Sequence, residues 1–296
     1  MEFLERALGT LVHRPYVFVF LAVYLWIASA HLGWRRTVFL SLLAYAVAFV
    51  AEWSSTRNGF PFGFYVYFDE AFRERELFVS NVPFWDSLSF SFLCYFGYTT
   101  ALTLVAPLEG RGITATRRES PALARSFVVL LISSFFTALV DIAIDPVTLL
   151  GDRWFLGRIY EYGQHGHYFG VPLSNFAGWF LVAFVTIGIF QRVDPRLGPG
   201  GRAADGRPAQ PHRRLAASAF VGPIVYVGVY AFVIAITFSI GEMTIAYASC
   251  FLLLAWSIPY LGSIWSRLRP GGLVERPQDS AESPAISSAR DASSSS

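Results

Sequence analysis

The chain has 296 residues, of which 54% are hydrophobic and only 15% are charged. Soluble domains carry about a quarter charged residues, so this composition excludes an ordinary soluble enzyme or binding domain. The formal net charge is +2 and every one of the 23 basic residues is an arginine, a balance that does not indicate a nucleic-acid partner. The apolar residues fall in blocks of the length that a bilayer requires, about 20 residues per helix.

Hydropathy windows of about 19 residues predict an all-α integral membrane protein with about seven transmembrane helices. Their expected ranges are 16–34, 36–52, 87–106, 124–144, 171–190, 217–240 and 244–265. Residues 53–86, between the second and third helices, are rich in aromatic residues, Gly and Pro, which is typical of a re-entrant or interfacial segment. The sequence therefore predicts a polytopic membrane domain over residues 1–268 and a disordered tail over 269–296, where Ser, Ala and Pro dominate.

Arginine placement predicts the orientation in the membrane. With seven helices, seven of the 23 arginines share the side of the N-terminus and the remaining 16 lie on the opposite side. Because cytoplasmic loops carry the excess of basic residues, the C-terminal tail is expected to be cytoplasmic. The expected location is the cell (inner) membrane, as a multi-pass protein.

Five acidic residues are expected near helix ends at the outer face: Glu52, Asp86, Asp141, Asp145 and Glu242. An acidic side chain at the centre of a membrane helix costs about 2.5 kcal/mol or more, so each of these needs a reason. The first four are the candidate catalytic residues.

Asp141 and Asp145 are four residues apart, so on a helix they share one face. Two like charges so placed repel each other and partial burial disfavours ionisation, so at least one is expected to hold its proton at neutral pH. Such a group can act as a general acid. The structural alternative is that Asp145 begins a turn before Pro146, because an Asp-Pro step commonly ends a helix.

Asn175 and Trp179 are also four apart and place an amide and an indole on one helical face. The alternative reading of Trp179 is an interfacial anchor. His165 and His167 lack a neighbouring third ligand in the sequence, and no metal site is assigned to them. The sequence contains no motif of a serine hydrolase, zinc protease or nucleotide-binding protein.

Three stretches carry a family resemblance when they are taken together. They are AEWSSTRNGFPFGFYVY (51–67), DIAIDPV (141–147) and YFGVPLSNFAGWF (168–180). They resemble the carotenoid biosynthesis membrane-protein family that includes bacterial carotenoid 1′,2′-hydratases and the archaeal bisanhydrobacterioruberin hydratase, over most of residues 20–265. The resemblance implies addition of water to the terminal isopropylidene double bond of an acyclic or monocyclic carotenoid. The stretch GQHGH before Tyr168 departs from the family pattern.

The residue types independently suit such a reaction. Hydration of a trisubstituted alkene begins with protonation, and water then captures the tertiary cation. This needs an acid in an apolar pocket, aromatic faces that tolerate a cation, and one admitted water, but no cofactor. Glu52, Asp141 and Asp145 could supply the acid and the base. The candidate substrate-binding residues are Trp53, Phe62, Tyr65, Tyr67, Trp154, Tyr168, Asn175 and Trp179.

Two other functions stay open at this point. A proton- or ion-coupled transporter would use intramembrane carboxyl groups as a relay, although here they gather at one face and no internal repeat accompanies them. A noncatalytic partner that scaffolds carotenoid enzymes is the other. The expected partners are a carotenoid from the bilayer, the membrane itself and other carotenoid biosynthesis enzymes.

Overall fold

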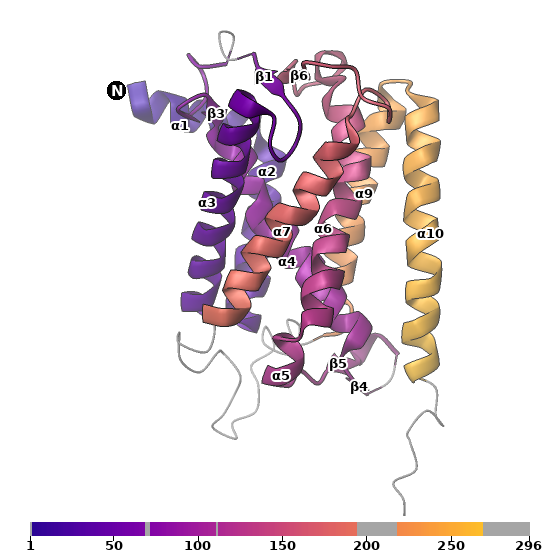
Figure 1. Ribbon diagram of the computed structural model, residues 1–296. Coiled ribbons are helices and arrows are strands. Elements are labelled where there is room, and N and C mark those ends of the chain that lie inside the picture. Colours follow the sequence, from indigo (N-terminus) through magenta and orange to yellow (C-terminus); the bar gives the residue numbers. More distant parts are fainter. Residues whose placement is uncertain (1, 69–71, 111, 194–217, 269–296) are drawn as a thin grey trace, which may run out of the picture.

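The structure is a computed structural model that describes residues 2–68, 72–110, 112–193 and 218–268 (Figure 1). The predicted tail over residues 269–296 lies outside the described residues. The helices are α1 (Glu2–His13), α2 (Pro15–His31), α3 (Trp34–Asn58), α4 (Phe84–Val105), α5 (Pro121–Ala124), α6 (Phe127–Thr148), α7 (Leu173–Val193), α9 (Val221–Ser239) and α10 (Met243–Leu268). The strands are β1 (Tyr65–Tyr67), β2 (Phe78–Val79), β3 (Val82–Pro83), β4 (Leu108–Glu109), β5 (Thr116–Arg117) and β6 (Tyr160–Tyr162).

The predicted multi-pass helical fold is confirmed. Among the described residues, six helices are long and apolar enough to cross a membrane, and α1 with α2 passes the same test as a pair bent by 87°. The number of spans is therefore six or seven. The segment between α3 and α4 consists, where it is described, of turns and short strands at one end of the bundle, which agrees with an interfacial position (Figure 1).

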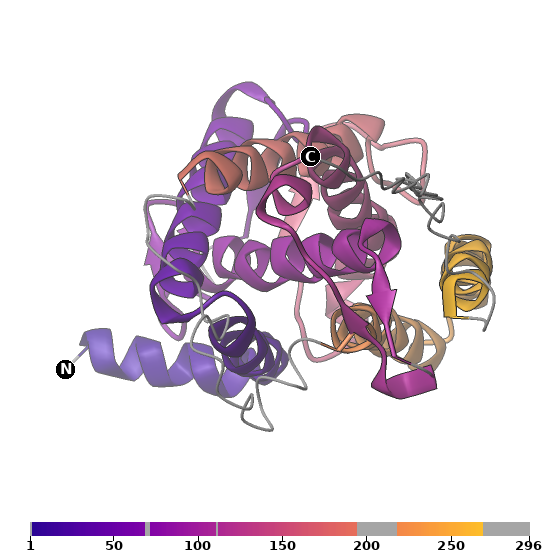
Figure 2. The same ribbon diagram turned by 90° about the horizontal axis from the view of Figure 1, so that it is seen from below.

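Helix α4 forms the centre of the bundle. Every residue from 90 to 103 is buried, because α2, α3, α6, α7 and α9 pack around it (Figure 2). Gly97 permits the close approach of α6, since a Cβ there would lie 2.6 Å from Thr137 Oγ1. Helix α10 packs outside this group, against α9 and α6.

Two helices, α3 and α6, extend at least four residues beyond their predicted ends. Helix α3 continues to Asn58 and ends at Gly59, which takes the left-handed conformation with φ of 81°. Glu52, which was expected at a helix end, therefore lies inside a helix.

Helix α6 continues through Pro146 to Thr148. Pro146 has no N–H to donate, but Leu149 N bonds to Asp145 O at 3.1 Å and Thr148 Oγ1 to Ile144 O at 3.0 Å, so the last turn is held. The interpretation of Asp145 as the point where the helix ends was wrong.

A two-stranded antiparallel sheet joins distant parts of the chain at the end of the bundle where the N-terminus lies. It pairs Tyr65 with Tyr162 and Tyr67 with Tyr160 (Figure 1). Arg14, at the bend between α1 and α2, fixes the two loops that carry these strands. Its side chain is 1% exposed, pairs with Glu76 at 2.8 Å and donates to the carbonyl of Leu156 at 2.6 Å.

Candidate active site

A cavity lies at the end of the bundle that carries the β1–β6 sheet. The space between its walls, open mouth included, is about 1010 Å³. All four predicted catalytic residues line it: Glu52 from α3, Asp86 from α4, and Asp141 and Asp145 from α6. The helical spacing and the packing of α3, α4 and α6 thus bring together the acids that the sequence placed at one face.

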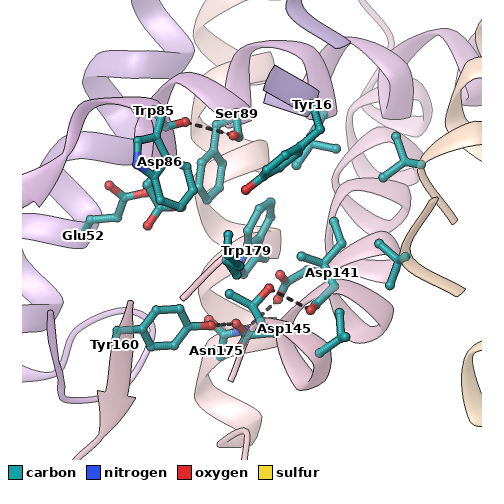
Figure 3. A pocket seen from close by; sticks show the side chains of 18 of the residues that line it. Tyr16, Glu52, Trp85, Asp86, Ser89, Asp141, Asp145, Tyr160, Asn175 and Trp179 are labelled. Carbon is teal, nitrogen blue, oxygen red and sulfur yellow. Dashed lines mark hydrogen bonds between the residues drawn. The ribbon is translucent and has the colours of Figure 1, made fainter. Parts of the chain in front are cut away.

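The two α6 acids form the first carboxyl group pair, which we call the α6 pair. Asp141 is 1% exposed and Asp145 is 6% exposed. The Asn175 side chain, from α7, donates from Nδ2 to Asp141 Oδ2 at 2.6 Å and to Asp145 Oδ2 at 3.0 Å. One amide therefore bridges both carboxyl groups, which share a face of α6 because they are four residues apart (Figure 3).

Two tyrosines of β6 complete the surroundings of Asp145. The Tyr162 hydroxyl donates to Asp145 Oδ2 at 2.7 Å, and the Tyr160 hydroxyl donates to Oδ1. Burial, followed by the nearby charge of Asp145, raises the pKa of Tyr162 well above its ordinary value. The phenol therefore stays protonated over the physiological pH range and acts as a donor.

Glu52 and Asp86 form a second pair, which we call the α3–α4 pair. Ser87 Oγ donates to Glu52 Oε2 at 2.5 Å, and the Tyr67 hydroxyl donates to Asp86 Oδ2 at 2.7 Å. The Tyr67 hydroxyl also lies 3.4 Å from that of Tyr65. The β1–β6 sheet therefore contacts both pairs, with β1 reaching Asp86 and β6 reaching Asp145.

Aromatic rings form much of the wall between the two pairs. Trp179 lies between them in Figure 3 and stacks on Phe90 with ring centroids 4.0 Å apart. Among the described residues, those that line the cavity include no arginine or histidine. Nor does the described part of the chain group three or more His, Cys, Asp or Glu side chains as metal ligands. The carboxyl groups thus rely on neutral hydrogen-bond donors in apolar surroundings.

Six of the eight predicted substrate-binding residues line the cavity: Phe62, Tyr65, Tyr67, Trp154, Asn175 and Trp179. Trp53 and Tyr168 are not among the lining residues. Trp53 is 42% exposed, and the Arg57 guanidinium lies 4.0 Å from the centre of its ring. Tyr168 packs against Phe169 and Phe176, at ring distances of 4.8 and 5.7 Å.

Sequence reasoning missed Tyr160 and Tyr162, the two donors to Asp145. The signal available was the similarity of two short alternating stretches, YVY at 65–67 and YEY at 160–162. Glu242, the fifth acid expected at this face, pairs with Arg153 near the same end and does not line the cavity.

The arrangement suits proton transfer in an apolar pocket. Carboxyl groups held by neutral donors can each give or take a proton, and aromatic faces stabilise a nearby cation. A search among curated proteins and among solved structures gave no match. Residues 13–256 match the family described as carotenoid biosynthesis protein. Because this match covers most of the sequence, the chain belongs to the carotenoid biosynthesis protein family.

Proposed function

We propose that this protein is a carotenoid hydratase, which adds water to the terminal isopropylidene double bond of an acyclic or monocyclic carotenoid. The observation that carries the proposal is the α6 pair: two buried carboxyl groups share one Asn175 amide inside a cavity with aromatic walls. A role in carotenoid biosynthesis follows from the family. The cavity supports this particular reaction within that role.

The first step is protonation of the alkene. The α6 pair holds one proton, an arrangement that the repulsion between two adjacent carboxylates favours. This proton goes to the less substituted alkene carbon, where the π electrons form the new C–H bond, and a tertiary cation remains on the neighbouring carbon. Trp179 and Phe90 present their ring systems in the same cavity, where they can stabilise that charge.

The second step is capture of the cation by water. In the proposal, the α3–α4 pair orients the water and accepts a proton as the C–O bond forms. Ser87 and Tyr67 hold these two carboxyl groups in place. The product is a tertiary alcohol, and the proton that the water loses balances the one that the α6 pair gave.

Expression in a carotenoid-producing host tests the reaction. Pigments from cells with and without the chain are separated and weighed by mass spectrometry, with Asp141→Asn as the matched control. Hydration adds the mass of one water per end group. Loss of a proton from the same cation would instead isomerise or cyclise the substrate with no change in mass, while a transporter or a scaffold would leave the pigments of a complete pathway unchanged by Asp141→Asn.

The orientation is proposed separately, with the cavity at the outer face and the C-terminus in the cytoplasm of a cell (inner) membrane. The excess of arginines on the opposite side from the N-terminus supports it. A reporter that is active only in the cytoplasm, fused to the C-terminus, is expected to give a signal. A well-expressed fusion without signal would reverse the assignment.

A further inference from the structure

We propose that the gap between α2 and α9 is a lateral portal, through which the end group of an apolar chain dissolved in the membrane reaches the carboxyl groups. This inference rests on the proposed function, since it takes a carotenoid end group as the occupant of the cavity. It concerns the path of the substrate, and it assigns that path to rings of α2 and α9 that have no role in the chemistry.

The described helices around α4 form a ring that has one opening. Helix α2 packs on α3, α3 on α7, α7 on α6 and α6 on α9. Within the described part of the chain, α9 and α2 do not pack substantially on each other, although both pack on α4. Figure 2 shows the two helices on the same side of α4 without an intervening helix. The other neighbouring helices pack directly on each other, so entry from the bilayer requires the least rearrangement between α2 and α9.

In the part of the chain that the structure describes, the opening is closed by side chains of α2, α4 and α9. The ring of Phe232, from α9, stacks on Tyr16 with centroids 5.4 Å apart and meets Phe20 at 6.1 Å. Phe20 in turn stacks on Phe92 of α4 at 5.8 Å. All four residues line the cavity that holds the acids. A wall made of rings opens by rotamer changes, which are far faster than the movement of packed helices.

The outer side of this wall is apolar. Phe155 is 56% exposed and packs against Tyr16 at a ring distance of 5.8 Å, and Val19 on α2 is 60% exposed. On the inner side, Val229, Val233 and Ile236 continue the cavity wall along α9. The path from the bilayer to the carboxyl groups is thus mostly apolar, which suits a long hydrocarbon chain with its end group innermost.

Photo-crosslinking tests the portal in the full-length chain, in membranes of a carotenoid-producing host. A diazirine-bearing phenylalanine replaces Phe232, and the matched control carries it at Ala231, which is exposed and points about 100° away around the same helix at nearly the same depth. The measured quantity is carotenoid adduct relative to phospholipid adduct. We expect at least a fivefold higher ratio at position 232 than at position 231. Equal ratios, or a higher ratio at position 231, would overturn the portal.

The same probe at Phe20 gives a second position on the wall, so that the result does not depend on one variant. Crosslinking needs no turnover, which separates the two proposals. Enrichment at positions 20 and 232 without hydrated pigment would keep the portal and reject the hydratase. Hydrated pigment without enrichment at either position would keep the hydratase and reject the portal.

Discussion

Two regions of the molecule bury carboxyl groups in opposite ways. At the end away from the cavity, Glu119 lies 3.0 Å from Arg117 Nε and 3.0 Å from His31 Nε2, with side chains that are at most 7% exposed. In the cavity, Asp141 and Asp145 are equally buried but meet an amide and phenols. The first region pairs its acid with a cation, and the second does not.

The difference distinguishes a carboxylate that stabilises the fold from carboxyl groups that can transfer a proton. A buried ion pair fixes the charge of its carboxylate, because removal of either partner leaves an uncompensated charge in the interior. A carboxyl group held by neutral donors is free of that constraint, so its protonation state can change during a reaction. The comparison therefore predicts that replacing a carboxylate by an amide lowers stability in the first region and lowers the rate of hydration in the second.

The largest effect is expected for Asp141→Asn. Asparagine keeps the size of the side chain and can still accept the hydrogen bond from Asn175, but it cannot donate an acidic proton. Loss of a general acid costs roughly a hundred- to ten-thousand-fold in rate, so unhydrated precursor should accumulate at normal protein level. Pigment mass profiles and an immunoblot measure both quantities. Near-normal hydration would place the proton donor elsewhere, with Glu52 or Asp86 as the next candidates.

Glu52→Gln is expected to rank second, with a loss of about a hundredfold, at the lower end of the range for a general base. Glutamine can still accept the Ser87 hydrogen bond, so the fold of α3 and α4 should persist. The matched control is Ser87→Ala, which removes the donor and keeps the carboxyl group. If both variants lose hydration equally, Glu52 acts through its contact with Ser87 and not as a base.

A smaller effect is expected for the double variant Tyr160→Phe and Tyr162→Phe. It removes both phenol donors to Asp145 while the rings that wall the cavity remain. Hydrogen bonds to charged groups contribute about 1.5 to 3 kcal/mol, so hydration should fall roughly tenfold or more. Initial rates of hydration in membranes, normalised to protein, measure it. The control is Tyr168→Phe, at a tyrosine that does not line the cavity, and it should leave the rate of hydration unchanged.

The smallest effect on hydration is expected for Glu119→Gln, which has the largest effect on stability. It leaves Arg117 buried without its carboxylate, which costs about 3 to 5 kcal/mol. Thermal unfolding in detergent should show the loss, while hydration per folded molecule stays normal. A full loss of hydration in protein that is still folded would contradict the separation of the two regions.

The sequence predicted the helices well because their length and apolar content are local properties. It also singled out the acids that line the cavity, since the free energy of burying Asp141 and Asp145 at membrane depth is high wherever the rest of the chain lies. It could not predict the β1–β6 sheet. Each strand has three residues, so its alternating pattern is too short to identify a strand by itself, and the pairing joins residue 65 with residue 162. The similarity of YVY and YEY was the one signal for the donors to Asp145, and it does not show that the two stretches pair.

The ends of helices were less accurate for a related reason. A window of apolar residues stops α3 at Glu52, the first charged residue after Arg36, yet backbone hydrogen bonding continues to Asn58. The helix α1 was missed because it is amphipathic and only 12 residues long, too short for a transmembrane window. In each case the missing information is a contact or a turn geometry, and hydropathy carries neither.

For the proposed hydratase, the position of the cavity at one end of the bundle has a consequence for the order of products. A polyene that spans a bilayer presents one of its two ends to each leaflet, and a site near a single leaflet meets only one of them. The second end becomes accessible only after the pigment molecule leaves, turns over in the membrane and returns. Pigments with two reactive ends should therefore pass through a free half-modified stage, and the rate of that inversion would set how quickly the doubly modified pigment appears.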